Sequence, residues 1–353
     1  MDEIVFSSND IYIDQIVKAI GLKIGWDVVR NKTFLITGAS GLIGMFLIDI
    51  LMYANVIYAL NIKIKAIGRD GEKAKKRFYD YFDKDSFSFI SHDVNNPLTI
   101  ENQCDYLIHG ASNTHPIAYA TDPIGTITAN VIGTRNILEY AVQHKNQRVV
   151  FLSSVEIYGE NRGDVDVFDE SYCGYIDCNT LRAGYPESKR LGEALCQAYI
   201  HEKNLDVVIP RLSRVYGPTM SDSDSKAIAQ FIKKAVNKED IILKSKGDQL
   251  YSYTYVADAV TAILYILIYG KCGEAYNISD ENSEITLRDL AETLGKMVGT
   301  AVIYEEPDIS EVVGYSKATK ALLCNNKLKS LGWNSRYNII DGLEQTIKIL
   351  KDK

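Results

Sequence analysis

A short glycine-rich turn constrains this chain more than any other stretch. Thr33–Thr37 has the pattern of a buried strand, Gly38-x-x-Gly41-x-x-Gly44 follows it, and an apolar helical run begins at Met45. In a strand–turn–helix of this kind, the first glycine permits the tight turn, the second lets backbone amides approach a pyrophosphate, and the third allows close helix–strand packing. The positive end of the helix also favours phosphates. The turn therefore predicts a dinucleotide-binding site.

Strand and helix patterns alternate along the first two thirds of the chain. This spacing predicts a parallel sheet with helices on both faces. An amphipathic helical stretch, Asn9–Arg30, precedes the first strand, and we expect it to pack on the domain that follows. The later strands are expected at Ile62–Ile67, Phe87–Ile90, Tyr106–His109, Arg148–Ser153 and Val207–Pro210, and the helices at Glu72–Tyr81, Pro123–His144 and Ser188–Lys203.

The rhythm changes after Tyr216-Gly217-Pro218, where short segments alternate with loops and charged helices. The expected helices there cover 226–238, 287–298 and 325–331. We therefore expect an α/β protein with a Rossmann-type doubly wound parallel sheet and a smaller, partly interleaved C-terminal α/β domain. The cofactor domain, with an N-terminal helical extension, is expected to cover 1–212 and about 251–270, and the substrate domain 213–250 and 271–353.

Composition excludes several classes of partner. The 353 residues carry a net charge of −7 and no long basic run, which argues against nucleic acid or an anionic membrane as the main partner. The apolar runs at 46–60 and 257–269 are interrupted or too short to span a bilayer. Six scattered cysteines form no C-x-x-C pair, so we expect no structural metal or disulfide framework. Free thiols and an acidic N-terminus without a signal pattern predict a cytoplasmic protein.

Tyr185 and Lys189 form a second candidate site. Residues four apart lie on one face of a helix, so the phenol and the ammonium can share a site. A free phenol has a pKa of about 10, and a nearby cation favours its ionised form. The pair could therefore accept a proton from a substrate hydroxyl. By itself the pattern is weak, because such pairs are usually a half-buried ring and a solvated amine.

The choice of dinucleotide is expected to depend on Gly68-Arg69-Asp70, directly after the second strand. An acid at this point hydrogen-bonds the ribose diol of NAD, whereas an arginine favours the 2′-phosphate of NADP. Asp70 favours NAD and Arg69 favours NADP, so these residues leave the choice open.

Four motifs in this order resemble the extended short-chain dehydrogenase/reductase family, and more narrowly its sugar-nucleotide epimerases, dehydratases and decarboxylases. The resemblance covers about 32–331. It implies NAD as cofactor, with NADP as the alternative, a nucleotide-sugar substrate bound by the second domain, and a role in making polysaccharide precursors. It also implies a homodimer formed through the helices at 123–144 and 188–203. The motifs are Thr37–Gly44, Ser153-Ser154, Tyr185-x-x-x-Lys189 and Arg211-x-x-x-x-Tyr216-Gly217-Pro218.

The resemblance also implies roles for individual residues. Tyr185 would take the proton of a sugar hydroxyl, Ser154 would hydrogen-bond the same hydroxyl, and Lys189 would hold the nicotinamide ribose and lower the pKa of the phenol. Glu156 would be the fourth catalytic residue, as a base at C5. The expected cofactor contacts are Gly38, Ser40, Gly41, Leu42, Ile43, Gly44, Arg69, Asp70, Asp93, Val94, Ala111, Asn130, Ser153, Tyr185, Lys189 and Arg211.

The reaction implied by the family starts with oxidation of the sugar, usually to a C4 ketone, which then allows dehydration, decarboxylation or epimerisation. Val155 stands where dehydratases carry an acid, which counts against dehydration. Tyr251 stands where decarboxylases carry an arginine, and losing that planar cation counts against decarboxylation. Arg214 could supply a cation from another direction, contact the diphosphate, or form a structural ion pair. The expected substrate contacts are Thr114, His115, Arg214 and Tyr251.

These substitutions leave 4-epimerisation as the predicted reaction, because it needs the fewest additional groups. A decarboxylase resembling those that act on UDP-glucuronate is the first alternative, and a 4,6-dehydratase resembling those that act on dTDP-glucose is the second. An NADP-dependent sugar-nucleotide reductase is a further alternative. A non-enzymatic sensor that keeps the cofactor fold is the last alternative. The complete set of Ser154, Tyr185 and Lys189 argues against it.

Overall fold

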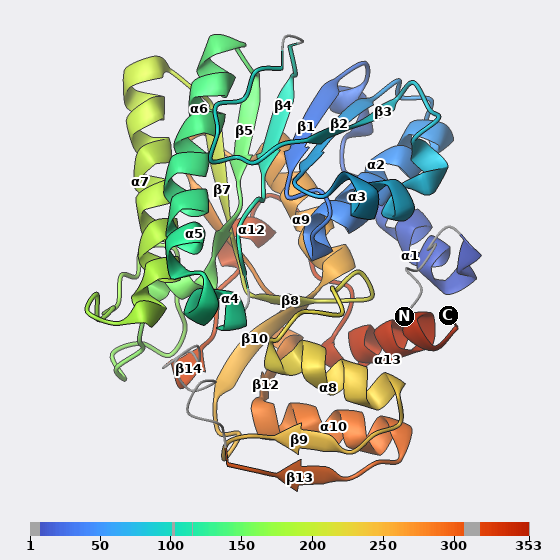
Figure 1. The fold of residues 1–353 in the computed structure, drawn as a ribbon, viewed down its shortest axis with the longest axis vertical. Coiled ribbons are helices and arrows are strands. Elements are labelled where there is room, and N and C mark those ends of the chain that lie inside the picture. Colours follow the sequence, from blue (N-terminus) through green and yellow to red (C-terminus); the bar gives the residue numbers. More distant parts are fainter. Residues whose placement is uncertain (1–7, 101–102, 115, 307–317, 353) are drawn as a thin grey trace.

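The computed structural model describes residues 8–100, 103–114, 116–306 and 318–352. Its largest element is a parallel sheet in the order β11-β7-β5-β4-β1-β2-β3, with the short β6 also paired to β7 (Figure 1). The order reverses between β1 and β4, which confirms the predicted doubly wound Rossmann-type fold. The strands are β1 Thr33–Thr37, β2 Lys63–Gly68, β3 Phe87–Ser91, β4 Tyr106–His109, β5 Arg148–Phe151, β6 Ser153–Ser154, β7 Val207–Leu212 and β11 Ala275–Ile278.

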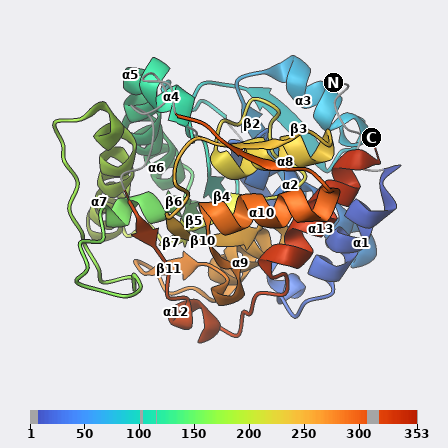
Figure 2. The same ribbon diagram turned by 90° about the horizontal axis from the view of Figure 1, so that it is seen from below.

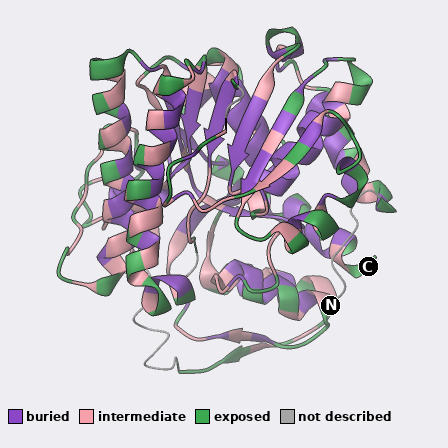
Figure 3. Ribbon diagram, turned by 45° about the horizontal axis from the view of Figure 1, so that its top comes forward, coloured by how far each residue is buried: buried purple, intermediate pink, exposed green. Residues whose placement is uncertain are grey.

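Helices cover both faces of this sheet, so its central strands are apolar on both sides (Figure 3). Successive side chains of β1 alternate between two separate cores: Phe34 and Ile36 pack in one, and Leu35 packs in the other. The first core contains α1 Asp10–Ile20, α2 Leu42–Ile57 and α9 Val256–Tyr269, and the second contains α6 Thr134–Gln143 and α7 Gly184–Lys203.

Two expected helices are divided in the structure. The N-terminal stretch forms α1 and a separate 3₁₀ turn, η2 Trp26–Val29, because Gly25 in the left-handed conformation (φ 76°) redirects the chain between them. The stretch expected at 123–144 consists of α5 Pro123–Thr128, a π-helical turn η4 Ala129–Gly133, and α6. The other helices beside the main sheet are α3 Gly71–Arg77, η3 Tyr79–Tyr81, α4 Pro116–Thr121, η5 Val155–Tyr158 and η6 Leu181–Ala183.

A smaller group of strands and helices lies beyond the carboxyl ends of the main sheet (Figures 1 and 2). In its sheet, β10 pairs with β12, β14 and β8. A separate parallel pair joins β9 and β13, and α8 packs beside α10. The elements are β8 Arg214–Tyr216, α8 Ala227–Val236, β9 Ile241–Leu243, β10 Leu250–Tyr255, η7 Glu281–Ser283, β12 Glu284–Thr286, α10 Leu287–Val298, β13 Val302–Tyr304, β14 Lys320–Ala321 and α13 Ile339–Lys351. The short helix α12 Asn326–Lys329 packs on β11 of the main sheet.

Two strands, β10 and β11, belong to a different sheet from the one expected from the sequence. β10 belongs to the smaller sheet, although most of it lies within the stretch expected in the cofactor domain. β11 pairs with β7 at the edge of the main sheet, although it lies within the stretch expected in the substrate domain. Strand pairing between distant segments determines both assignments, and local pattern does not reveal it.

Two kinds of feature are absent from the described residues. Over these ranges, no helix combines the length and apolar character needed to cross a membrane. The same ranges contain no group of three or more His, Cys, Asp or Glu side chains that could hold a metal ion.

A buried carboxylate ties the helices around α2 together. Asp49 of α2 accepts hydrogen bonds from the hydroxyls of Tyr12 (2.5 Å) and Tyr81 (2.9 Å), and it forms an ion pair with Arg77 of α3. Its side chain is 3% exposed and that of Arg77 is 9% exposed. Because α2 begins at the glycine turn, this network helps to hold the predicted cofactor site in place.

We expect Asp49→Ala to lower the free energy of unfolding by about 3–5 kcal/mol, because it removes the buried carboxylate that a largely buried guanidinium and two buried hydroxyls share. Asp27→Ala is the control, since Asp27 pairs with Arg30 but is 91% exposed, and its loss should change stability by less than about 1 kcal/mol. Urea unfolding of both variants measures the difference, and equal midpoints would contradict it.

Candidate active site

A cavity of about 1300 Å³ opens at the carboxyl ends of the main-sheet strands, where the strand order reverses. Doubly wound sheets bind their ligands at this position. Residues from both sheets line the cavity, including Thr37 at the end of β1, Gly68 at the end of β2, and Tyr251 of β10. A ligand in this cavity can therefore contact the glycine turn at one end and the smaller sheet at the other.

The glycine turn has the shape that a dinucleotide needs. Gly38 has a φ of 70°, and a Cβ there would lie 2.6 Å from the carbonyl oxygen of Gly110. A Cβ on Gly44 would lie 2.4 Å from the carbonyl oxygen of Gly38, so the turn packs tightly against α2. Ser40 contributes a buried hydroxyl oxygen without a hydrogen-bond partner in the described structure. The turn, the start of α2 and this hydroxyl fit the pyrophosphate of a dinucleotide.

The expected adenosine end of the cavity contains both Arg69 and Asp70. Asp70 caps α3 by accepting a hydrogen bond from the backbone N–H of Lys73 (3.0 Å), and both side chains are exposed. Asp93 and Val94 also line this end. The two residues that are expected to choose between NAD and NADP therefore lie side by side at the cavity.

Tyr185 and Lys189 are both buried on α7, but they do not interact as predicted. Burial raises the pKa of Tyr185 to about 12, although a hydrogen bond from Ser154 and the charge of Arg182 oppose this rise. The ammonium of Lys189 donates to the carbonyl of Leu152 (2.8 Å) instead. Burial also lowers the pKa of Lys189 to about 8. Lys189 is not among the groups that set the pKa of Tyr185 in this arrangement, so the expected lowering of the phenol pKa by Lys189 stays a prediction.

Ser154 and Glu156 lie beside this phenol. Ser154 caps η5 by accepting a hydrogen bond from the backbone N–H of Glu156 (3.2 Å). Arg182 donates from Nη2 to Oε2 of Glu156 (2.6 Å), and Nη2 of Arg214 lies 3.7 Å from Oε1. Burial alone would raise the pKa of Glu156, but the charges of the two arginines outweigh it and hold the pKa below its usual value. Glu156 is therefore an ion-paired carboxylate in this state.

Arg214 also stacks on Tyr251, the residue that stands in place of the decarboxylase arginine. The Cζ atom of Arg214 lies 3.3 Å from the centroid of the Tyr251 ring. The hydroxyl of Tyr251 donates to the carbonyl of Ala318 (2.8 Å), which fixes the ring. The tyrosine thus supports a cation that comes from the neighbouring strand β8.

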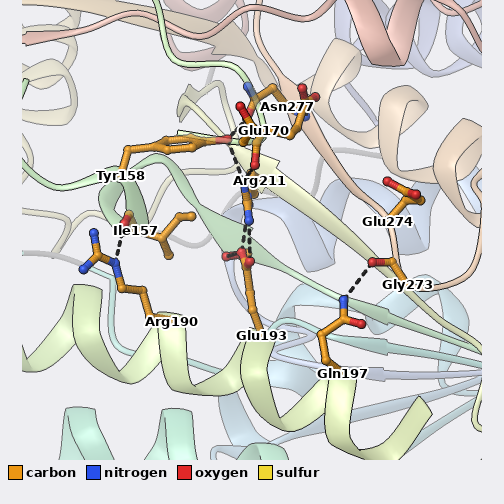
Figure 4. A network of polar contacts seen from close by, with 12 residues as sticks. Ile157, Tyr158, Glu170, Arg190, Glu193, Gln197, Arg211, Gly273, Glu274 and Asn277 are labelled. Carbon is orange, nitrogen blue, oxygen red and sulfur yellow. Dashed lines mark hydrogen bonds and ion pairs between the residues drawn. The ribbon is translucent and has the colours of Figure 1, made fainter. Parts of the chain in front are cut away.

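A polar network behind the site fixes α7 against the sheet (Figure 4). Arg211 donates from Nη2 and Nε to the carboxylate of Glu193 (2.7 and 3.0 Å) and from Nη1 to the hydroxyl of Tyr158 (3.0 Å). Glu193 also accepts a hydrogen bond from Ser153 (2.5 Å). The structure does not support the expected cofactor contact of Arg211, because its donors are engaged here and it does not line the cavity.

Asn130 lies within the π-helical turn η4 and does not line the cavity either. Its amide donates to Ser188 (2.9 Å), whose hydroxyl donates to the carbonyl of Tyr185 (2.8 Å). The insertion of an extra residue in a π turn often marks a functional site. Here the turn brings the Asn130 amide onto α7 and helps to position Tyr185.

The structure brings most of the predicted site residues to one cavity. His115 lies outside the described residues, and Lys189 lies behind Tyr185 without lining the cavity. The predicted residues that line it are Gly38, Ser40, Gly41, Leu42, Ile43, Gly44, Arg69, Asp70, Asp93, Val94, Ala111, Thr114, Ser153, Ser154, Glu156, Tyr185, Arg214 and Tyr251.

The residues of this cavity that sequence reasoning missed include Tyr119 and Arg182. The ring of Tyr119 stacks on that of Tyr185 with centroids 4.8 Å apart, and the guanidinium of Arg182 lies 4.9 Å from the centroid of Tyr119. Tyr119 belongs to α4, which no pattern in the sequence predicted. Arg182 precedes Tyr185 by three residues, and this closeness to the start of the helix was the available signal.

A doubly wound sheet with this turn and this tyrosine–lysine helix is the arrangement of a nicotinamide-dependent enzyme of the extended short-chain dehydrogenase/reductase class. The chain belongs to the NAD-dependent epimerase/dehydratase family, whose profile matches residues 34–279. Membership makes it an enzyme and assigns NAD as the cofactor, which confirms both predictions.

Curated relatives and solved structures agree with this family. The chain is 30% identical over 315 residues to UDP-glucuronic acid decarboxylase 3 of Arabidopsis thaliana, covering 89% of this chain and 87% of the relative. The dTDP-glucose 4,6-dehydratase DesIV of Streptomyces venezuelae matches the fold with a TM-score of 0.78 at 23% identity, over 91% and 97% of the two chains. An epimerase of Methanothermobacter thermautotrophicus matches with a TM-score of 0.79 at 18% identity, over 96% of each chain.

We expect Gly38→Ala to weaken NAD binding at least about tenfold, because a side chain at a φ of 70° is strained and its Cβ would collide with the backbone of Gly110. Gly71→Ala is the matched control, since a Cβ there meets nothing within 4 Å. Calorimetric titration with NAD compares the two variants. Unchanged affinity in Gly38→Ala would show that the turn does not hold the pyrophosphate.

Proposed function

We propose that this enzyme converts a nucleotide-activated uronic acid by oxidising the sugar at C4 and then releasing its C6 carboxylate as carbon dioxide. The observation that carries the proposal is the placement of Arg214 over Tyr251 in the cavity that holds Tyr185. Epimerisation was predicted because Tyr251 replaces an arginine, and the stacked Arg214 supplies a cation in the same part of the cavity. The decarboxylase named among the 30%-identical relatives favours the same reaction.

The residues of the cavity fit the oxidation step. Tyr185 would accept the proton of the C4 hydroxyl as a phenolate, a form that the hydrogen bond from Ser154 and the charge of Arg182 favour and that burial opposes. Ser154 would hydrogen-bond the same hydroxyl. When bound, NAD would supply reversible hydride chemistry at C4. Lys189, held by the Leu152 carbonyl, and Asn130, acting through Ser188, keep α7 and its tyrosine in place. The residues proposed to hold NAD are those of the glycine turn together with Arg69, Asp70, Asp93, Val94, Ala111 and Ser153.

The ketone then makes loss of carbon dioxide easy. In a C4 ketone of a uronic acid, the carboxylate is β to the carbonyl, so the electron pair of the breaking C5–C6 bond passes onto the ketone oxygen as an enolate. A proton added at C5 and a hydride returned to C4 give the nucleotide pentose. The arginines of the cavity would contact the carboxylate before it leaves, and their side chains are largely buried.

Epimerisation of the same uronic acid at C4 is the second candidate. Glu156 favours it, because its ion pairs with Arg182 and Arg214 keep it deprotonated and without a proton to give to C5. Dehydration is disfavoured because the apolar Val155 cannot protonate a leaving hydroxyl.

The reaction test is to incubate the NAD-loaded enzyme with UDP-glucuronic acid and follow the products by mass spectrometry. We expect a product that has lost the mass of carbon dioxide, and a new sugar of unchanged mass would instead identify the epimerase. Tyr185→Phe should lower the rate about 100-fold or more, because it removes the proton acceptor. Tyr119→Phe keeps the stacked ring and should stay within about tenfold of the unmodified enzyme; an active Tyr185→Phe would contradict the assignment.

We also propose that the enzyme forms a homodimer in the cytoplasm. Exposed apolar side chains gather on adjoining elements on one side of the main sheet: Ile124 is 75% exposed, Ile132 46% and Leu191 47%. These belong to α5, η4 and α7, the helices expected to form the interface. All six cysteines are free thiols, which fits a reducing compartment.

We expect Leu191→Glu to shift the protein towards the monomer, because it places a charge in an apolar interface. Val56→Glu is the control, since Val56 is 75% exposed on α2, away from the proposed interface. Light scattering coupled to size-exclusion chromatography measures both masses. A dimer that survives Leu191→Glu unchanged would place the interface elsewhere.

A further inference from the structure

Two arginines in the cavity share a single carboxylate. Glu156 of η5 pairs with Arg182 of η6 at 2.6 Å and with Arg214 of β8 at 3.7 Å. The side chains of Glu156, Arg182 and Arg214 are only 22%, 12% and 17% exposed. The cluster therefore carries an excess positive charge in a site with little access to water.

Both arginines have buried N–H groups that make no hydrogen bond to the described residues. Nε and Nη1 of Arg182 and Nη1 of Arg214 are buried and have no hydrogen-bond partner among the described residues. A guanidinium does not lose its charge in a protein, and leaving its donors unmet is costly. Both the charge and the free donors point to an anionic ligand.

Aromatic rings fix this pair of arginines beside the reacting phenol. Arg182 lies over Tyr119, which in turn stacks on Tyr185, and Arg214 lies over Tyr251. The anion that the arginines select is therefore a substituent of the sugar near the reacting carbon. A C6 carboxylate meets this description, because C6 is joined to the carbon next to C4.

We propose that Arg182 and Arg214 together form the receptor for the C6 carboxylate of the substrate, and that Glu156 is a counter-ion that this carboxylate displaces. The inference rests on the proposed function, because it requires a uronic acid substrate. It assigns to Arg182 a role that the sequence motifs do not show. It also gives Glu156 two states, one paired with the arginines before the substrate binds and one free of them afterwards.

Displacement would change the chemistry of Glu156. Once the arginines hold the substrate, burial of Glu156 is no longer opposed by their charges, so its carboxyl takes up a proton. That proton is then available for C5 after carbon dioxide has left. The described charged and titratable groups that face Glu156 are Arg182 on η6, Arg214 on β8, Tyr185 on α7, Tyr119 on α4 and Tyr251 on β10.

The test measures binding of UDP, UDP-glucose and UDP-glucuronic acid to the NAD-loaded Tyr185→Phe enzyme by calorimetry. We expect UDP-glucuronic acid to bind about tenfold or more tightly than UDP-glucose, as two charge-assisted hydrogen bonds allow. Arg182→Gln and Arg214→Gln, each added to Tyr185→Phe, should remove this preference and leave the affinity for UDP unchanged. Arg162→Gln is the control, because Arg162 is 59% exposed and stacks on Tyr175 away from the cavity. Arginine variants that weaken all three ligands equally would instead indicate binding of the diphosphate and would overturn the receptor.

Displacement of Glu156 has two separate readouts. Glu156→Gln should strengthen the binding of UDP-glucuronic acid severalfold, because it removes the competing carboxylate, and weaker binding would overturn the exchange. Repeating the Tyr185→Phe titration in buffers of different ionisation enthalpy should show uptake of about one proton with UDP-glucuronic acid and none with UDP-glucose. This readout needs no substitution at the arginines, and absence of uptake would also overturn the exchange.

Failure of this inference can be told from failure of the proposed function. If the unmodified enzyme releases carbon dioxide but the arginine variants still prefer UDP-glucuronic acid, only the receptor is overturned. If the preference disappears in those variants but the unmodified enzyme gives no decarboxylated product, the receptor is supported and the proposed reaction is overturned.

Discussion

The ion pair between Glu193 and Arg211 holds α7, the helix that carries Tyr185, against the sheet. Glu193 lies one turn after Lys189 on α7, and Arg211 lies on β7, so the two charges join the helix to the strand beneath it. Both side chains are largely buried, at 13% and 12% exposed, and Tyr158 and Ser153 share the network. Removing either charge would leave the other buried and unpaired, which is far more costly than losing a surface pair. The contact therefore links α7, which carries Tyr185, to Ser153, the neighbour of Ser154.

Much of the fold could be predicted from the sequence because its signals are local. The glycine turn and β1 lie where the pattern placed them, and α10 has the predicted bounds. The position of β11 could not be predicted, because the pairing of Ala275–Ile278 with β7 joins segments more than sixty positions apart along the printed sequence. Periodicity within a segment says which face is apolar, but it does not say which strand becomes its neighbour.

In the site too, local features could be predicted from the sequence and contacts between distant segments could not. The motif residues Ser154 and Tyr185 reach the cavity because their positions follow from the turn and the helix that carry them. The partners of Arg211 and Glu156 could not be predicted, because they come from elements far away in the chain. The weak electrostatic link between Lys189 and the phenol also depends on three-dimensional detail, namely the carbonyl of Leu152 that holds the ammonium. The sequence therefore identified the residues proposed for the oxidation step better than the residues proposed to decide the fate of the oxidised sugar.

The repeated passage of the chain between its two sheets has a consequence for biosynthesis. The main sheet contains β7 and then, after the smaller sheet has been entered and left, β11. On a ribosome, the edge strand of the cofactor-binding sheet therefore emerges after β8, β9 and β10 have been made. A nascent chain that stops short of Ala275 would expose the backbone groups of β7 that β11 normally covers. Both sheets receive their last strands from the C-terminal part of the chain. Neither sheet can therefore be produced from one uninterrupted fragment of the gene.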